Sequence, residues 1–203
     1  PIWIYELYVK EERVFDPSIK AYHNDIKVNN EALDPETITV LLNKPSGFIC
    51  SHNDAGSLIY ALIPQRWNRR NPKISTIGRL DVDTTGAIIL TDDGALNHKL
   101  SSPKSDVSKV YEATLAVPLK GDEKEIFASG ELMLNGEKKP LLPAKLEVLG
   151  ETHVRLEICE GKYHQVKRMF AAVGNRVLTL HRVSFGGFTV EDLKEGEYKF
   201  IEL

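Results

Sequence analysis

The hydrophobic positions of this chain fall into short runs that end at turn-forming residues. Residues 38–44 (ITVLLNK) begin with β-branched side chains, continue with apolar ones and stop at Pro45, a pattern that predicts a strand. Residues 48–51 (FICS) are expected to return as a second strand. Residues 57–63 (SLIYALI) predict a short helix that ends at Pro64.

Strand patterns dominate the rest of the chain. β-Branched and apolar runs predict further strands over residues 73–80, 86–91, 108–117, 176–185 and 197–203. Residues 145–150 and 153–160 alternate between polar and apolar side chains, which predicts a hairpin around Gly150 and Glu151.

Two segments have the pattern of helices. Asp92 or Asp93 can cap a helix over residues 94–102, because a carboxylate there accepts from free N–H groups and complements the helix dipole. Residues 163–173 (YHQVKRMFAAV) predict an amphipathic helix, and Gly174 follows as a C-terminal cap. Its apolar stripe has the i, i+3, i+4, i+7 spacing: Val166, Met169, Phe170 and Val173.

Many strands with few helices between them indicate an α+β fold with a mixed, mostly antiparallel sheet flanked by helices. The chain has 203 residues and is 42% hydrophobic, enough for one core plus a small appendage. Residues 1–37 are acidic and contain Pro17 and Pro35, so they are expected to form a separate N-terminal extension. Residues 38–203 are expected to form the main domain.

Several features bear on the compartment and on bound metals. No run of 18 apolar residues occurs, so no membrane span is expected. Residues 1–15 lack the basic start and the small-residue cleavage site of a signal peptide. Cys50 and Cys159 stand far apart and outside any CxxC pair, as is typical of reduced thiols rather than of disulfides or a zinc site. We therefore expect a cytoplasmic protein without a metal.

Charge is segregated along the chain. The net charge is −3, yet residues 1–40 carry four basic and eight acidic side chains. Residues 161–182 carry five basic side chains and no acid, and residues 65–73 carry four basic side chains and no acid. Such segregation is typical either of solvated loops and helix faces or of a local positive surface that binds nucleic acid.

The segment GRLDVDTTGAIILTDDG, residues 78–94, sets two carboxylates beside a buried strand. Counted from Asp81, it partly fits an EF-hand calcium loop, but its flanks have the pattern of strands instead of helices. Asp81 and Asp83 also satisfy the spacing of a paired-carboxylate glycosidase, but a sugar groove usually has aromatic platforms, and only Trp67 is near in sequence. A single nucleophilic or general-base Asp, kept ionised by a nearby cation, is the third interpretation.

The same segment resembles the central motif of the RsuA/Rlu family of pseudouridine synthases. Three other blocks resemble family motifs in the same order: LLNKPSGFICS (41–51), KVYEATL (109–115) and EGKYHQVKRMFAAVGNRVLTLHRVSFGG (160–187). The resemblance covers the chain from about residue 38 to its end. It implies the pseudouridine synthase fold and the isomerisation of a uridine in RNA, without a cofactor.

Two departures from the family pattern stand out. Ala87 occupies a position where Leu is common, which is tolerable on a core strand. Full-length relatives begin with a small helical S4-type RNA-binding module, whereas residues 1–35 resemble at most its final strands. The resemblance therefore implies that most of this module is missing.

The resemblance implies three catalytic residues. Asp81 is the nucleophile or base, which attacks C1′ or abstracts a proton from the sugar. Lys167 is the basic residue that pairs with this carboxylate, and the helical period of about 100° per residue also lets it reach inward. Tyr111 stacks on the flipped uracil and assists proton removal at C5.

Other residues are expected to bind RNA or uracil. Arg79 is the candidate to enter the gap that the flipped base leaves, and Leu180 is the candidate for the pocket floor. Arg168 lies opposite the apolar stripe and is expected to face solvent or RNA. Lys162 and Arg182 complete the predicted set. Residues 65–73 and 161–182 are expected to line one positive cleft around Asp81. His164 and His181 are not needed by the family mechanism, and Asp83 is expected to brace the turn.

The pair Tyr163 and His164 before Gln165 resembles the small-subunit branch of the family. The predicted partner is therefore 16S ribosomal RNA or an assembling small ribosomal subunit, and the protein is expected to act as a monomer. Two alternatives stay open. One is a synthase that acts on large-subunit rRNA, and the other is a non-catalytic RNA-binding or ribosome assembly factor.

Overall fold

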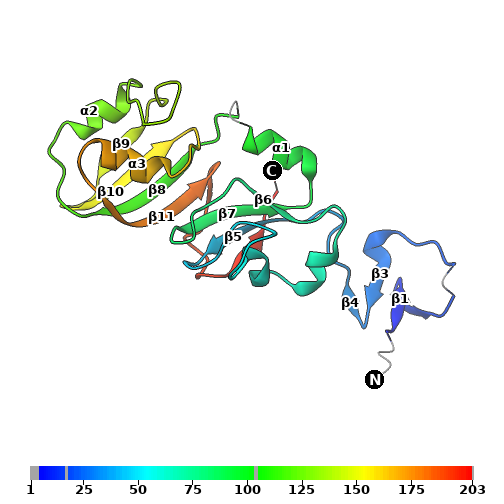
Figure 1. The fold of residues 1–203 in the computed structure, drawn as a ribbon. Helices are drawn as coiled ribbons and strands as arrows, with labels where there is room; N and C mark the ends of the chain where they lie inside the picture. Colours follow the sequence, from blue (N-terminus) through cyan, green and yellow to red (C-terminus); the bar gives the residue numbers. More distant parts are fainter. Residues whose placement is uncertain (1–4, 17, 103–104, 203) are drawn as a thin grey trace. The chain divides into compact units, whose positions relative to one another are not determined.

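A computed structural model describes residues 5–16, 18–102 and 105–202, and the chain divides into two compact units (Figure 1). The N-terminal unit is Pro1–Ile38 and the C-terminal unit is Thr39–Leu203. Every residue predicted for the site belongs to the C-terminal unit.

The N-terminal unit is built on a four-stranded antiparallel sheet with the order β2-β1-β3-β4. Its strands are β1 (Leu7–Val9), β2 (Glu12–Val14), β3 (Ile26–Val28) and β4 (Glu31–Ala32), with a 3-10 helix at His23–Asp25. Asn29 and Asn30 join β3 to β4 with φ angles of 51° and 67°, the conformation of a two-residue type I′ hairpin. Among residues 5–16 and 18–38 there is no α-helix.

The C-terminal unit is built on a mixed sheet with the main order β13-β5-β7-β11-β8-β10-β9. Its strands are β5 (Thr39–Lys44), β6 (Ser75–Ile77), β7 (Thr85–Thr91), β8 (Lys109–Leu115), β9 (Lys145–Val148), β10 (His153–Ile158), β11 (Val177–Phe185), β12 (Phe188–Thr189) and β13 (Tyr198–Phe200). Strands β7 and β11 pair in parallel, and the other named pairs are antiparallel. The predicted α+β class is confirmed.

Three α-helices pack against this sheet. They are α1 (Gly94–Ser101), α2 (Glu123–Ala128) and α3 (Gln165–Ala172), which contact β6 and β7, β9, and β11 respectively. Asp93 is the N-cap of α1, since its side chain accepts from the N–H of Leu96 at 2.9 Å. Gly174 ends α3 with a φ of +80°, as predicted, and its N–H donates to the Ala171 carbonyl.

Two parts of the unit differ from the predictions. The predicted strand over residues 48–51 is wrong, because only Ile49 forms an isolated bridge, to Leu58, and no strand runs alongside. The predicted helix over residues 57–63 is a 3-10 helix, Ile59–Leu62, and a second one follows at Gln65–Arg69.

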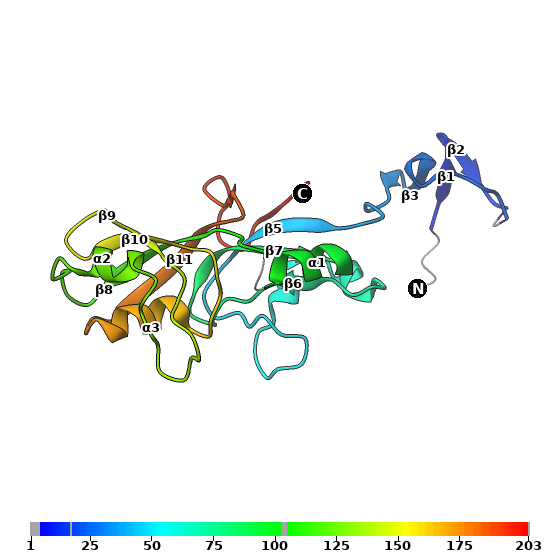
Figure 2. The ribbon, with the colours of Figure 1, turned by 90° about the horizontal axis from the view of Figure 1, so that it is seen from above.

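One hydrophobic core lies on the half of the sheet that α1 covers (Figure 2). It consists of Leu41, Ile77, Ala87, Ile89, Phe185 and Val190, with Leu96 and Leu100 of α1 packed against it. On the other half, Phe127 of α2 meets Phe170 of α3 edge to face, with ring centroids 5.2 Å apart. The two cores hold β7, β8, β11 and α3 in fixed positions, and these elements carry the site.

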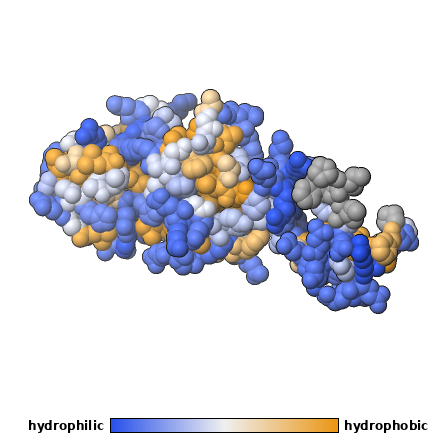
Figure 3. Space-filling view, turned by 90° about the horizontal axis from the view of Figure 1, so that it is seen from below, coloured by the Kyte–Doolittle hydropathy of each residue, from blue (hydrophilic) through white to orange (hydrophobic). Residues whose placement is uncertain are grey.

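The surface of the C-terminal unit mixes apolar patches with hydrophilic groups (Figure 3). Val148 and Leu178 are examples of apolar side chains that are more than half exposed. The longest helices, α1 and α3, have eight residues, whereas a membrane span needs about 20. Within the described residues, no helix has the length and apolar character to cross a bilayer.

Gly86 is required where β7 and β11 approach each other. Its φ is +105°, and a Cβ atom there would lie 2.2 Å from the Arg182 carbonyl oxygen. Gly86→Ala is expected to lower the free energy of unfolding by about 3 kcal/mol or more. In thermal melts that corresponds to a loss of roughly 6–12 °C. Gly94→Ala is the control, because a Cβ there meets nothing within 4 Å. Equal melting temperatures for the two variants would contradict this packing.

Candidate active site

The turn before β7 is held by a buried lysine. Lys44, at the end of β5, is fully buried, and its Nζ donates to four backbone carbonyls at 2.8–3.2 Å. These carbonyls belong to Pro45, Asp81, Val82 and Thr84. Burial lowers the pKa of the Lys44 ammonium. The contacts fix the backbone from which the Asp81 side chain projects.

Lys44→Met is expected to destabilise the C-terminal unit by roughly 3 kcal/mol, because carbonyls that are buried with the lysine lose their donor. Catalysis should fall as well, since the turn loses its fixed geometry. Thermal melts and single-turnover assays below the lowered melting temperature measure the two effects. Lys99→Met, at an exposed lysine of α1, is the control. A Lys44→Met protein as stable as this control would contradict the role.

The Asp81 carboxylate is contacted at both oxygens by the beginning of α3. Lys167 Nζ lies 2.9 Å from Oδ2, and His164 Nε2 lies 3.2 Å from Oδ1. The Asp81 side chain is 27% exposed, so it remains open to a ligand. The predicted pairing of Lys167 with Asp81 is present, and His164, which was expected to have no role, is the second partner.

Lys167 also joins the two acids of the turn. Its Nζ lies 2.7 Å from Asp83 Oδ1, and this hydrogen bond holds the pKa of the Asp83 carboxyl below its usual range. Burial alone would lower the pKa of Lys167, but its hydrogen bonds to Asp83 and Asp81 outweigh burial and raise it. Lys167 is thus kept charged, and through it Asp83 braces the turn against α3.

Asp81 lies at the wall of a cavity of about 510 Å³. The cavity brings together seven of the eight residues predicted for the site: Arg79, Asp81, Tyr111, Lys162, Lys167, Leu180 and Arg182. They come from the turn before β7, from β8, from β11 and from the start of α3. A volume of this size is in the range of small-ligand pockets and accommodates one nucleotide.

The inner part of the cavity is lined by groups from β8 and β11. Tyr111 and Leu180 are 8% and 7% exposed, and Arg182 is 2% exposed. Arg182 Nε donates to the Ala87 carbonyl at 2.6 Å, and Nη1 lies 3.4 Å from the Tyr111 hydroxyl. Within the described part of the chain, the buried Nη2 of Arg182 has no hydrogen-bond partner. The guanidinium therefore contains one buried donor that is not paired within the described residues.

The cavity is positive although the chain as a whole is acidic. Among the described residues that line it, six are Lys or Arg and two are Asp or Glu. Lys109 and Lys139 belong to this set and were not predicted. Lys109 begins the family-like block KVYEATL, which was the available signal for it, whereas the segment GEKKP around Lys139 matches none of the quoted motifs.

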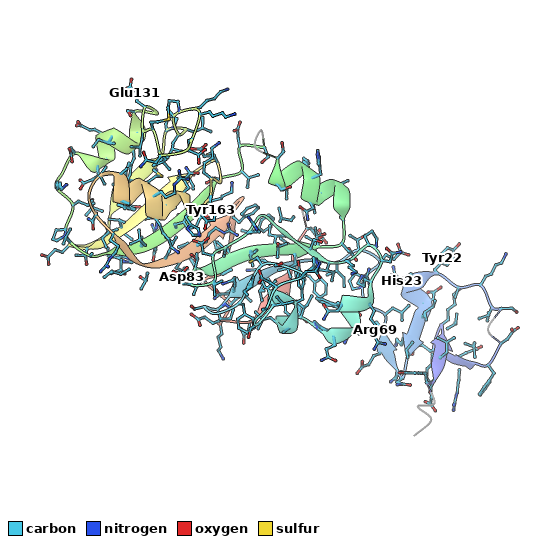
Figure 4. The ribbon with its side chains drawn as sticks, viewed as in Figure 1. Tyr22, His23, Arg69, Asp83, Glu131 and Tyr163 are labelled. Atoms are coloured by element: carbon cyan, nitrogen blue, oxygen red, sulfur yellow. The ribbon has the colours of Figure 1, made fainter. Side chains whose placement is uncertain are left out.

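One prediction about the positive surface is wrong. No described residue of 65–73 lines the cavity, and Arg69 lies away from Asp83 and Tyr163 (Figure 4). Arg168, which was predicted to face solvent or RNA, has a side chain that is 26% exposed and is held at three places. It donates to Glu137 Oε1 at 2.9 Å and to the carbonyls of Asn135 and Tyr163.

The calcium interpretation also fails on geometry. Asp92, the twelfth position of an EF-hand loop counted from Asp81, accepts from Arg70 Nε at 2.5 Å. The Asp81 carboxylate is paired with Lys167, and residues 85–91 of the segment form strand β7 instead of a loop. An EF-hand needs these oxygens on one cation between two helices.

Residues 38–172 match the family model described as RNA pseudouridylate synthase. The chain belongs to this family. The match includes the predicted catalytic residues Asp81, Tyr111 and Lys167. The RsuA/Rlu resemblance and the pseudouridine synthase fold are therefore confirmed.

Curated relatives extend this result. The ribosomal small subunit pseudouridine synthase A of Escherichia coli (strain K12) is 48% identical over 163 residues, which cover 78% of this chain and 68% of the relative. The protein of the same name from Vibrio cholerae is 45% identical over 163 residues and covers 80% and 69%. These relatives confirm that the resemblance is to the small-subunit branch.

Solved structures agree with the fold. A crystal structure of a pseudouridylate synthase superposes with a TM-score of 0.76 at 40% identity, covering 97% of this chain and 85% of the other. A chain of an archaeal box H/ACA sRNP complex superposes with a TM-score of 0.54 at 16% identity, covering 93% and 60%. At this low identity, the second match supports only the fold.

Proposed function

We propose that this family member isomerises one uridine of small-subunit ribosomal RNA to pseudouridine, with Asp81 as the catalytic carboxylate. One observation carries the proposal. Asp81 stands at the wall of a positive cavity of about 510 Å³, 2.9 Å from Lys167, and the buried Tyr111 and Leu180 line the same cavity. The names of the curated relatives support small-subunit rRNA as the substrate class.

The reaction is balanced without a cofactor. The N1–C1′ bond of the uridine breaks, the uracil turns, and a C5–C1′ bond forms. C5 then loses its proton and N1 gains one, so that no electrons enter or leave. The protein has to supply a carboxylate that acts on the ribose, a base for the C5 proton and a closed pocket that retains the detached uracil.

The groups around Asp81 fit these needs. Lys167 places a positive charge on one oxygen, which stabilises the carboxylate when the RNA covers the site and excludes water. Tyr111 presents its ring and hydroxyl to the cavity, where the ring stacks on uracil and the hydroxyl assists removal of the C5 proton. Leu180 forms the apolar floor, and Arg182 Nη2 is a donor for a uracil carbonyl.

The rim of the cavity fits an RNA chain. A stacked uridine must leave its helix to reach Asp81, which costs a few kcal/mol and favours a uridine in a loop. Arg79 is exposed at the rim and is proposed to occupy the gap that the base leaves. Lys162 and Arg168 both form ion pairs with Glu137. We propose that they give up these ion pairs when RNA binds and contact its phosphates instead.

The proposed substrate also indicates where the protein acts. Small-subunit rRNA or a partly assembled small subunit is a cytoplasmic partner. Every side chain that the mechanism uses comes from one chain, so we propose that the protein acts as a monomer.

Tritium release from RNA labelled at C5 of uridine tests the proposal. Small-subunit rRNA should release tritium, and the rate should fall steeply with salt, because each phosphate contact releases counterions. Binding without release would identify an RNA-binding or assembly factor instead. Tritium release from large-subunit rRNA alone would identify the enzyme as a synthase that acts on large-subunit rRNA.

A further inference from the structure

Tyr163 lies between Lys162 and His164, two residues that line the cavity, and its side chain is largely uncovered. Its residue is 70% exposed, although it lies next to the residue that contacts the catalytic carboxylate. The Tyr163 ring is stacked on the His164 ring, with centroids 3.8 Å apart and planes inclined by 20°. Contacts therefore lead from Asp81 Oδ1 through the His164 ring to the exposed Tyr163 ring.

The backbone fixes this stack in place. His164 adopts a left-handed conformation, with φ 46° and ψ 36°, which a residue other than glycine rarely adopts without a reason. Arg168 Nη1 donates to the Tyr163 carbonyl at 3.0 Å. The backbone N–H of Lys162 donates to Gln165 Oε1 at 2.8 Å, and Gln165 is buried. The stack is thus held before any ligand binds.

We infer that Tyr163 and His164 form a stacking platform for the base of a nucleotide adjacent to the target uridine. This inference rests on the proposed function. When the uridine enters the cavity at Asp81, its neighbours in the strand must stay outside it, within reach of the exposed Tyr163 ring that is stacked on the cavity-lining His164. Unpaired bases stack on aromatic side chains of this kind, and the lysines at the rim suit the phosphates beside such a base.

The platform recognises where the neighbouring base lies and whether it is unstacked. It does not recognise which base it is, because every base offers a flat face for stacking. Selection of the target uridine therefore depends on an adjacent nucleotide whose base can leave its stacked position in the RNA. The two rings therefore set a preference for flexible loop sequences on one side of the target.

Single-turnover assays test the platform on an RNA fragment that carries the modified uridine. Tyr163→Leu keeps an apolar side chain without an aromatic face, and it should raise the half-saturating enzyme concentration about tenfold. Tyr163→Phe retains the ring and should restore most of the affinity. Because Tyr163 is exposed, both variants are expected to fold, and thermal melts check this.

A double-mutant cycle identifies the nucleotide. Synthetic fragments with an abasic ribose at each of the two positions on either side of the target uridine are compared between wild type and Tyr163→Leu. At one position the loss of affinity caused by the abasic ribose and the loss caused by Tyr163→Leu should not add, since either change removes the same stacking contact. Additive losses at all four positions, or equal losses for Tyr163→Phe and Tyr163→Leu, would overturn the platform. If the wild-type protein forms no pseudouridine in any rRNA, the proposed function fails and the platform fails with it.

Discussion

Asp81→Asn is expected to abolish pseudouridine formation while the protein keeps its fold and its affinity for RNA. The amide has nearly the same shape as the carboxylate but is neutral, so it neither attacks the ribose nor abstracts a sugar proton. Loss of a nucleophile usually costs several orders of magnitude in rate. Single-turnover assays at saturating enzyme should show a rate below about a hundredth of the wild-type value.

The structure indicates why Asp81→Asn should still fold. The backbone of the turn is held by Lys44, and α3 stays joined to the turn through Lys167 and Asp83, at 2.7 Å. Thermal melts and RNA-binding curves of the variant are the controls. A well-folded Asp81→Asn protein that retains more than about a hundredth of the wild-type rate would exclude Asp81 as the main catalyst.

Lys167→Met is expected to reduce the rate of the chemical step about a hundredfold or more, even at saturating RNA. The substitution leaves the Asp81 and Asp83 carboxylates facing each other without their shared cation. A carboxylate that RNA covers without this charge is a poorer catalyst. The single-turnover rate at saturating enzyme separates this effect from a loss of binding.

Arg168→Met is the matched comparison, because it removes a cation from the next position of the same helix without touching Asp81. Arg168 is tied to Glu137 and to the Asn135 carbonyl, so its loss should loosen that loop and weaken RNA binding. The slope of log binding constant against log salt concentration should fall by at most the amount that corresponds to about one phosphate contact. Equal reductions of the single-turnover rate in Lys167→Met and Arg168→Met would contradict the assigned helix faces.

The strongest sequence patterns gave reliable predictions of the fold. Strands β5 and β7 lie inside long apolar runs, and their buried faces leave little freedom of register. The stripe of α3 places Lys167 at its border, and the structure confirms that this side chain reaches Asp81. Helix α2 was missed because its six residues, EKEIFA, are too short to show a period.

Other features depend on tertiary contacts that no local pattern reports. Lys44 stands at the end of strand β5 (TVLLNK), directly after Asn43 and before Pro45, and no local pattern there predicts that its charge is buried. Arg182 counts as a basic residue in the sequence, yet it lies inside the unit beside Tyr111. Counting basic residues along the chain therefore overestimates how many of them lie on the positive surface. The same count led to the wrong prediction that residues 65–73 line the cavity.

The position of the new pseudouridine in ribosomal RNA tests the central claim most directly. The protein is incubated with small-subunit rRNA, with partly assembled small subunits and with large-subunit rRNA, and pseudouridine is mapped at nucleotide resolution. The structure and its relatives predict a single modified uridine in the small-subunit RNA, free or partly assembled, and no modification when Asp81→Asn replaces the wild type. A defined pseudouridine in large-subunit rRNA with none in the small-subunit RNA, or one formed equally well by Asp81→Asn, would contradict the account.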